Sequence, residues 1–269
     1  MARSTFLDKQ IATSYGGEKY IEINSTGDGA NATGADSIAI GYTSDILSDR
    51  GIAIGYASVI GAANSDKSIA VGDTARVDSL ESIAIGPEAF CKTMTRKSVA
   101  IGKNATIDTN SRYSTAIGYY ARVTAESSIV IGSPALSQSE KSIVMGSPAT
   151  SRSEKSIAIG WQAGINTSSN NSIAIGYASV NSGNPSGIAI GYQAISNAAG
   201  AVQIGSGSNS ASNTIQFQSN RIANTTGILA GASSGAPAGA GTTNEIRFDS
   251  GTGILYIYDG SSWLSTTLT

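Results

Sequence analysis

Histidine is absent from the 269 residues, cysteine occurs once, and charged residues are few. Without an imidazole, the chain has no His-based general base, proton shuttle or metal ligand. The single Cys91 excludes an intrachain disulfide framework and the multi-cysteine zinc motifs. Lys, Arg, Asp and Glu make up 13% of the chain, about half of the ~25% found in ordinary soluble domains. Most enzyme classes are therefore not expected.

An excess of charge of one sign is also missing, since the formal net charge is −2 and we find no basic cluster. This balance gives no reason to expect a nucleic-acid partner. Residues 1–10 carry charges and no apolar core, so we expect no secretory signal and a chain that stays in the cytoplasm where it is made. The longest weakly polar run, residues 51–64, is well short of the ~20 residues of a membrane helix, so we expect no membrane insertion.

Isoleucine and glycine dominate what is present. There are 33 isoleucines against 8 leucines, together with 32 glycines, 11 tyrosines and frequent Ser, Thr and Asn. β-Branched and aromatic residues favour extended backbone, and glycine favours turns over helix. The composition predicts an all-β protein.

A short repeat, Ser-Ile-Ala-Ile-Gly, organises most of the chain. With small variations, its copies end at Gly41, Gly55, Gly72, Gly86, Gly102, Gly118, Gly132, Gly146, Gly160, Gly176, Gly191 and Gly205. Successive copies lie 14 to 17 residues apart, most often 14, so the extra residues are interpreted as loop insertions. The repeat predicts twelve coils.

Each coil is predicted to be strand, turn, strand and loop. In the first strand, period-two alternation places Ile83 and Ile85 on one face and Ala84 on the other. A second short strand follows the glycine, as at Ala75 to Val77, with Arg76 facing solvent. We expect the isoleucines to fill the interior together with the apolar residues of the second strand, and Ala84 and its equivalents to lie on the outer face.

Fourteen residues make only two strands of about five residues and two turns, which predicts a flattened two-sided roll with a parallel ladder on each side. Twelve coils at ~4.8 Å each give a rod of roughly 55 to 60 Å. An exposed ladder of alanines is an association hazard. We therefore expect this face to be buried between copies of the chain, in a number that these residues do not fix.

The repeats resemble the head domain of trimeric autotransporter adhesins, the YadA-like left-handed parallel β-roll, whose repeats contain Ser-Val-Ala-Ile-Gly at a spacing near 14. The likeness covers about residues 34 to 206. It implies a homotrimer of three rolls around a common axis, with the alanine face of the first strand inward. The residues at this axis would be Ala39, Ala53, Ala70, Ala84, Ala100, Ala116, Ala158, Ala174 and Ala189.

The chain departs from that family because it shows no secretory signal, coiled-coil stalk or membrane-barrel segment. The same roll occurs in phage fibre proteins, and residues 251–263 are similar to a short β module of phage virion proteins. The resemblance thus implies a non-enzymatic structural protein of a phage virion, a trimeric fibre or head-decoration spike that contacts capsid or tail proteins and is assembled in the host cytoplasm. Open alternatives are a receptor-binding tail fibre that recognises a host-surface glycan or protein, and a fragment of a bacterial trimeric surface adhesin.

The sequence divides into four regions. Residues 1–33 lack the repeat, contain a plausible strand at Lys19 to Ile23, and are interpreted as an attachment arm. Residues 34–206 form the roll. Residues 207–242 hold one strand and a Gly/Ala/Ser-rich connection, and residues 243–269 read as a β-hairpin tip.

No catalytic, cofactor or metal site is predicted. No serine has a histidine or a plausible lysine partner to activate it, and no phosphate-binding glycine motif occurs. Glu126, Glu140 and Glu154 occupy equivalent coil positions and are interpreted as a solvated ladder, with a polysaccharide-depolymerase cleft as the open alternative. Cys91 takes the position held by Val77 in a neighbouring coil, which indicates core packing rather than a reactive thiol.

Aromatic residues are the candidate recognition residues. Rings that directly follow a repeat glycine are predicted to stack in interrupted columns: Tyr42, Tyr56, Tyr119, Trp161, Tyr177 and Tyr192. In the C-terminal tip the candidates are Tyr256, Tyr258 and Trp263. Such rings can bind the faces of sugars in a host glycan, but packing against neighbouring coils or subunits explains them with fewer assumptions and is the preferred interpretation.

Overall fold

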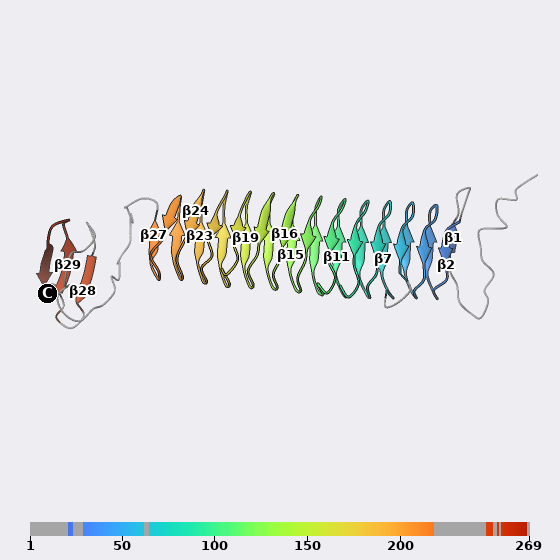
Figure 1. The fold of residues 1–269 in the computed structure, drawn as a ribbon, viewed down its shortest axis with the longest axis horizontal. Helices are drawn as coiled ribbons and strands as arrows, with labels where there is room; N and C mark the ends of the chain where they lie inside the picture. Colours follow the sequence, from blue (N-terminus) through green and yellow to red (C-terminus); the bar gives the residue numbers. More distant parts are fainter. Residues whose placement is uncertain are drawn as a thin grey trace, which may run out of the picture. The chain divides into compact units, whose positions relative to one another are not determined.

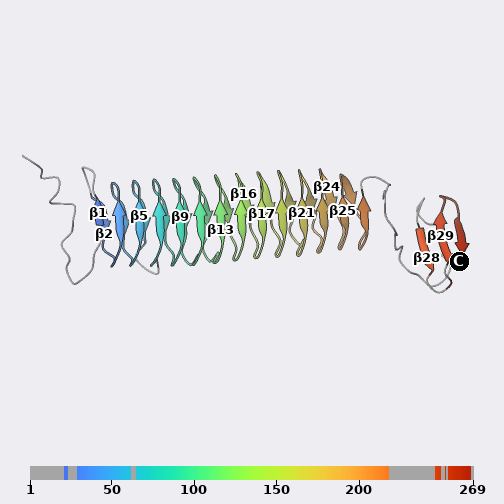
Figure 2. The same cartoon turned by 180° about the vertical axis from the view of Figure 1, so that it is seen from behind.

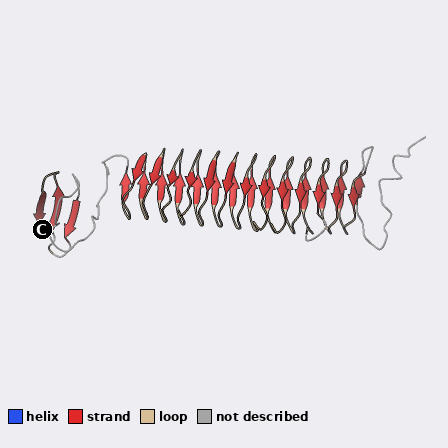
Figure 3. Ribbon diagram, viewed as in Figure 1, coloured by secondary structure: helices blue, strands red, loops and turns tan. Residues whose placement is uncertain are grey.

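The computed structural model describes residues 21–23, 29–61, 65–217, 246–249, 252 and 254–267. The chain divides into two compact units, Met1–Gln218 and Ser219–Thr269. Every regular element in the described residues is a β-strand, as Figure 3 shows, and no helix among these residues is suited to cross a membrane. Residues 1–20 of the predicted attachment arm and most of the predicted connection lie outside the described residues.

The first unit is a parallel β-roll in which each coil adds one strand to each of two sheets (Figures 1 and 2). Sheet A has fourteen strands: β1 (Ile21–Ile23), β3 (Ile38–Ile40), β5 (Ile52–Ile54), β7 (Ile69–Val71), β9 (Ile83–Ile85), β11 (Val99–Ile101), β13 (Thr115–Ile117), β15 (Ile129–Ile131), β17 (Ile143–Met145), β19 (Ile157–Ile159), β21 (Ile173–Ile175), β23 (Ile188–Ile190), β25 (Val202–Ile204) and β27 (Ile215–Phe217). Sheet B has thirteen: β2 (Asn31–Ala32), β4 (Asp45–Ile46), β6 (Val59–Ile60), β8 (Arg76–Val77), β10 (Phe90–Cys91), β12 (Thr106–Ile107), β14 (Arg122–Val123), β16 (Ala135–Ser137), β18 (Ala149–Ser151), β20 (Gly164–Ile165), β22 (Val180–Asn181), β24 (Ala194–Ser196) and β26 (Gly207–Asn209).

The predicted all-β parallel roll is confirmed, but it extends further than residues 34–206. The predicted strand at Lys19 to Ile23 contains β1, which pairs with β3 as the first rung of sheet A. At the other end, β27 pairs with β25 as the last rung. Both rungs lack the repeat glycine, so the sequence repeat counts twelve coils where the sheets have fourteen and thirteen strands.

Equivalent residues of neighbouring coils stack in register. Ala100 of β11 pairs with Ala116 of β13, and the repeat glycine that ends each first strand stacks on the next one. Gly102 has φ +126°, and a Cβ there would lie 2.5 Å from the carbonyl oxygen of Gly118. A side chain therefore has neither the backbone conformation nor the space it needs, which explains the glycine in every full repeat.

The facing of the first strand is the reverse of the prediction. The alanines assigned to a trimer axis are fully buried inside their own roll: Ala39, Ala53, Ala70, Ala84, Ala100, Ala116, Ala158, Ala174 and Ala189. Their neighbours point the other way, as in β9, where Ile85 is 38% exposed and Ala84 is 0% exposed. Since a side chain enclosed by its own chain has no free surface, these alanines cannot line an axis between copies.

The narrow interior explains this reversal. In six coils the second strand carries a large buried apolar residue, such as Ile60, and the first strand of the same coil carries alanine. The narrow interior has no room for a second large residue there. Where the second strand has serine inside, at Ser137 and Ser151, the first strand carries Val130 and Val144.

A ladder of buried serines lies beside the alanines. The repeat serine is fully buried in most coils, and its hydroxyl accepts a hydrogen bond from the backbone N–H of the equivalent serine in the next coil. Ser114 N–H donates to Ser98 Oγ at 3.0 Å, and Ser128 N–H donates to Ser114 Oγ at 3.2 Å. These bonds supply partners for backbone groups that water cannot reach.

The second unit contains a three-stranded antiparallel sheet, β28 (Ile246–Asp249), β29 (Ile254–Tyr258) and β30 (Trp263–Thr267). The predicted hairpin is confirmed as β28 and β29, and β30 is a third strand beyond it. The turn into β30 is closed by Asp259, whose Oδ1 accepts hydrogen bonds from the backbone N–H groups of Ser262 and Ser261 at 2.8 and 2.7 Å. These bonds lower the pKa of Asp259 to about 2.

Candidate binding surfaces of the roll

Sheet A presents two columns of outward side chains, which together form what we call the apolar face. From β3 to β27 every outward position is Ile, Val, Met or Phe, with Thr115 as the exception. Ile129 and Met145 are 40% and 38% exposed. The combined exposed area is on the order of 1,000 Å², whereas soluble monomers rarely expose apolar patches above a few hundred Å². This face has the size and composition of an interface.

Sheet B presents a mixed surface, which we call the polar face. Its outward positions include Arg76, Phe90, Thr106 and Arg122 on four successive coils. The predicted solvent exposure of Arg76 is confirmed; Arg122 at the equivalent position is also exposed, and Thr106 is partly exposed. Unlike the apolar face, this surface is compatible with water.

Ion pairs on the polar face lie both between neighbouring coils and within one coil. Asp108 accepts hydrogen bonds from Lys92 Nζ and, at 2.6 Å, from Arg122 Nε. Arg76 Nε donates to both carboxylate oxygens of Asp78, at 2.9 and 2.8 Å. Two cations thus share the single carboxylate of Asp108.

The predicted aromatic columns are confirmed for five of the six rings. Tyr42 and Tyr56 stack with ring centroids 5.4 Å apart, and Trp161, Tyr177 and Tyr192 form a stack with separations of 4.6 and 5.0 Å. Tyr119 is in neither column, because it packs edge to face on Tyr120. The stacked rings thus pack coil against coil, as the packing interpretation predicts.

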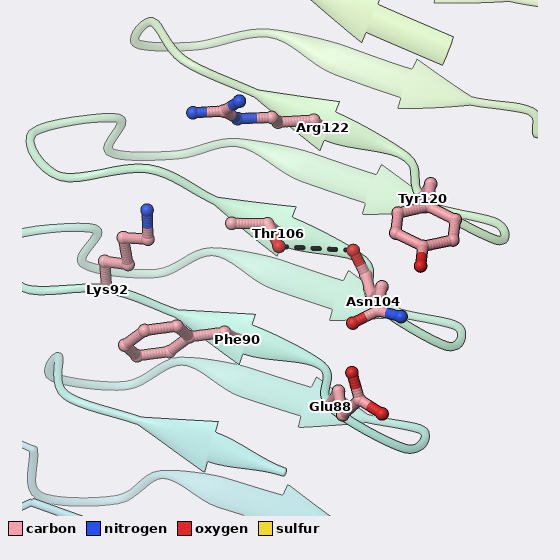
Figure 4. A pocket seen from close by; sticks show the side chains of 7 residues that line it. All are labelled: Glu88, Phe90, Lys92, Asn104, Thr106, Tyr120 and Arg122. Carbon is pink, nitrogen blue, oxygen red and sulfur yellow. Dashed lines mark hydrogen bonds between the residues drawn. The ribbon is translucent and has the colours of Figure 1, made fainter. Parts of the chain in front are cut away.

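A hollow of about 420 Å³ lies on the polar face, and we call it the sheet B hollow (Figure 4). It is lined by Glu88, Phe90, Lys92, Asn104, Thr106, Tyr120 and Arg122. Three successive coils contribute one residue each at the turn, Glu88, Asn104 and Tyr120, and the same coils contribute Phe90, Thr106 and Arg122 from β10, β12 and β14.

The C-terminal candidates have unequal exposure. Tyr258 is only 7% exposed, and its ring packs on Trp263 with centroids 5.2 Å apart. Tyr256 and Trp263 are partly exposed. Tyr258 thus serves the packing of the small sheet, and a recognition role for Tyr256 and Trp263 stays a prediction.

The three glutamates interpreted as a solvated ladder lie on the surface. Glu140 and Glu154 are exposed, Glu126 is partly exposed, and the described residues contain no group of three or more Cys, Asp or Glu that could hold a metal ion. Cys91 is fully buried between Val77 and Ile107, and burial raises the pKa of its thiol to about 12. Its predicted role in core packing is confirmed.

Comparison with known proteins agrees with this geometry. Residues 26–44, 63–89, 110–133 and 138–163 match the sequence model described as "YadA head domain repeat (2 copies)". The coils are similar to YadA head repeats. One relative, the autotransporter adhesin EhaG of Escherichia coli O157:H7, is 43% identical over 68 residues. That match covers 25% of this chain and 4% of the adhesin, so the chain spans only a small part of its relative.

The resemblance of the coils to YadA head repeats is thus shown by sequence comparison as well as by the parallel roll. The sheet B hollow is the feature that sequence reasoning missed. Its equivalent lining residues in successive coils, such as Phe90, Thr106 and Arg122, are 16 positions apart along the chain. They become neighbours only when the second strands stack in register. Aligning the outward positions of those strands shows the signal, a short Thr106 between the bulky Phe90 and Arg122.

Proposed function

We propose that the chain is the rod of a trimeric adhesin-type protein, which associates with two further copies through the apolar face and presents the polar face to its surroundings. The observation that carries this proposal is the double column of Ile, Val, Met and Phe on sheet A, in which Thr115 is the one polar residue. The match to YadA head repeats and to an autotransporter adhesin supports it. No catalytic role is part of the proposal.

Burial of apolar surface drives the association. At ~25 cal/mol per Å², covering on the order of 1,000 Å² in each chain gives a large gain, and no charged side chain in these columns opposes it. A rod with one apolar side closes on itself when a few copies share a common axis. Three copies follow from the likeness to trimeric adhesins.

Sedimentation equilibrium of the wild-type protein and two variants tests this proposal. We expect a mass of about three times the 27.2 kDa of one chain at micromolar concentration. Ile131→Lys places three like charges at the apolar axis and should yield monomers. Leu136→Lys makes the same change on the outward side of β16 in sheet B and should leave the trimer intact.

A monomeric wild-type protein would refute the proposed assembly. Dissociation of both lysine variants to the same extent would show that the apolar face is not the interface. Circular dichroism confirms that each variant keeps its strand content, which both outward substitutions should allow.

A phage virion fibre is the second candidate for the context in which the rod acts. It rests on the sequence alone, in which residues 251–263 resemble a short β module of phage virion proteins. In that context the attachment arm of residues 1–33 would join the rod to capsid or tail proteins. Electron microscopy of intact particles with a residue-specific label on the roll distinguishes this setting from a bacterial surface.

A further inference from the structure

We propose that the sheet B hollow binds a pyranose ring that carries a carboxylate, as in a hexuronic or sialic acid of a surface glycan. This inference rests on the proposed function in one respect, because the polar face must stay uncovered in the assembled rod. It adds a site and a ligand class to that function. The shape, the aromatic wall and the distribution of charge each point to this ligand.

The shape follows from one short side chain. Phe90, Thr106 and Arg122 occupy the same outward position on three stacked strands. Because Thr106 is short, a gap opens between its two large neighbours, whose strands lie two coil spacings, roughly 9 to 10 Å, apart. A single sugar ring fits a hollow of about 420 Å³.

Aromatic rings border the hollow on two sides. The guanidinium carbon of Arg76 lies 5.5 Å from the centroid of the Phe90 ring, and Lys92 Nζ lies 6.0 Å from it. Tyr120 comes from the turn two coils further on and is held edge to face against Tyr119, with centroids 4.4 Å apart. Fixed, partly exposed rings suit the C–H face of a sugar.

The polar groups divide by charge across the hollow, as Figure 4 shows. Lys92 and Arg122 lie on one side, and Glu88 and Asn104 lie on the other with Thr106 between them. Lys92 has three donors and Arg122 has five, but Asp108 is the one acceptor that they share. Donors therefore remain for a ligand carboxylate, and a charge-assisted pair with Arg122 is stronger than a neutral hydrogen bond.

The opposite side suits hydroxyl groups. The Glu88 carboxylate and the Asn104 carboxamide make no side-chain hydrogen bond or ion pair to the described residues. They can accept from and donate to the hydroxyls of a sugar whose carboxylate faces Lys92 and Arg122. A neutral sugar would bring no second carboxylate to the two cations, which share Asp108 as their one acceptor.

Saturation-transfer NMR and titration calorimetry on the full-length protein test the proposal with two ligands that differ in one group. Methyl β-glucuronide carries a carboxylate where methyl β-glucoside has a hydroxymethyl group. We expect glucuronide binding with a Kd of about 1 mM and a preference of about tenfold over the glucoside. A parallel titration with a methyl sialoside shows whether the hollow binds sialic acid or glucuronic acid more tightly.

Matched variants locate the site. Thr106→Phe fills the hollow and should abolish binding, whereas Thr150→Phe makes the same change at the same outward position of β18 and should leave the Kd unchanged. Arg122→Gln keeps the Lys92–Asp108 pair and should remove the preference for the glucuronide. Strand content and oligomeric mass are measured for each variant.

No binding of either acidic sugar up to tens of millimolar would overturn the proposal, as would equal binding of glucuronide and glucoside. Equal loss in Thr106→Phe and Thr150→Phe would place the ligand elsewhere and would also overturn it. The trimer mass is measured separately, so a trimer without sugar binding contradicts this inference alone, and a monomer contradicts the proposed function.

Discussion

The side chain of Ala116 is a single methyl group, and it is fully buried in the interior of its coil. Val123 in the second strand of the same coil is a large residue and leaves no further space. At this scale the roll is specified by the combined side-chain volume of the two strands: alanine is paired with a large residue, and Val130 and Val144 lie in coils whose second strand has serine inside.

Ala116→Leu should therefore lower the free energy of unfolding by about 1 to 3 kcal/mol, since the added methylenes meet a filled interior. Thr150→Leu, on the outward side of β18, should change it by less than about 0.5 kcal/mol. Urea unfolding followed by circular dichroism measures both. If the two variants were equally stable, Ala116 would not lie in the interior.

Cys91 shows how burial controls chemistry at one position. Desolvation raises the pKa of its thiol from 9.0 to about 12 in the folded chain. Above pH 9 the unfolded chain can release this proton while the folded chain keeps it, so folding stability falls as pH rises from 9 toward 12.

Replacing the thiol removes this contribution. Cys91→Val copies Val77 of the neighbouring coil. Its free energy of unfolding should fall less steeply with rising alkaline pH than that of the wild-type protein, by up to about 1.4 kcal/mol per pH unit. Urea midpoints of both proteins at pH 8 and pH 10.5 measure the difference. Parallel pH profiles would mean that the Cys91 thiol ionises as readily in the folded chain as in the unfolded chain.

At the scale of the coil, hydrogen bonds between equivalent serines join one turn of the roll to the next. Ser114→Ala removes the acceptor of the Ser128 N–H, along with the hydroxyl that donates to the carbonyl of Ala125 at 3.2 Å. Because Ser114 is 1% exposed, water does not replace these partners.

This substitution should lower the free energy of unfolding by about 1 to 3 kcal/mol. Amide hydrogen exchange should also become faster at Ser128 and remain unchanged several coils away, at Ser172, since each coil contacts only its neighbours. Unchanged exchange at Ser128 would show that the serine ladder does not hold the coils together.

Period-two alternation predicts that Ile83 and Ile85 share a face, but it does not say which face is inside. That choice depends on the second strand, because the volume of Val77 and its equivalents decides what fits opposite them. The sequence also did not predict that non-glycine turn residues adopt positive φ. Lys97 and Asn104 have φ of 57° and 58°, a conformation more often taken by glycine. The stacking of successive coils holds them there.

The coil itself was predictable because its signal repeats. A glycine every 14 to 17 residues marks each turn, so the two-strand coil and the parallel stacking follow from the sequence. The terminal rungs β1 and β27 have the alternation without the glycine and escape a search for the repeat. The sheet B hollow escapes it for a related reason, since it arises where the repeat varies.

Over the whole roll, the two outer surfaces have opposite character. Sheet A carries two apolar columns, and sheet B carries ion pairs, single apolar residues and the hollow. In our proposal, this division gives the rod one side for association and one side for recognition. It depends on strict register, because a slip of one residue would exchange Ile85 with Ala84.

Methionine oxidation of the native protein tests the central claim, that the apolar face is covered by other copies of the chain. Met145 on the apolar face is 38% exposed in a single chain, and Met94, in a turn outside this face, is 58% exposed. Dilute peroxide oxidises exposed methionines, and mass spectrometry of proteolytic peptides gives the rate at each site. We predict that Met94 oxidises rapidly and that Met145 is protected at least tenfold until the protein is denatured. Oxidation of native Met145 at a rate comparable to that of Met94 would contradict the account.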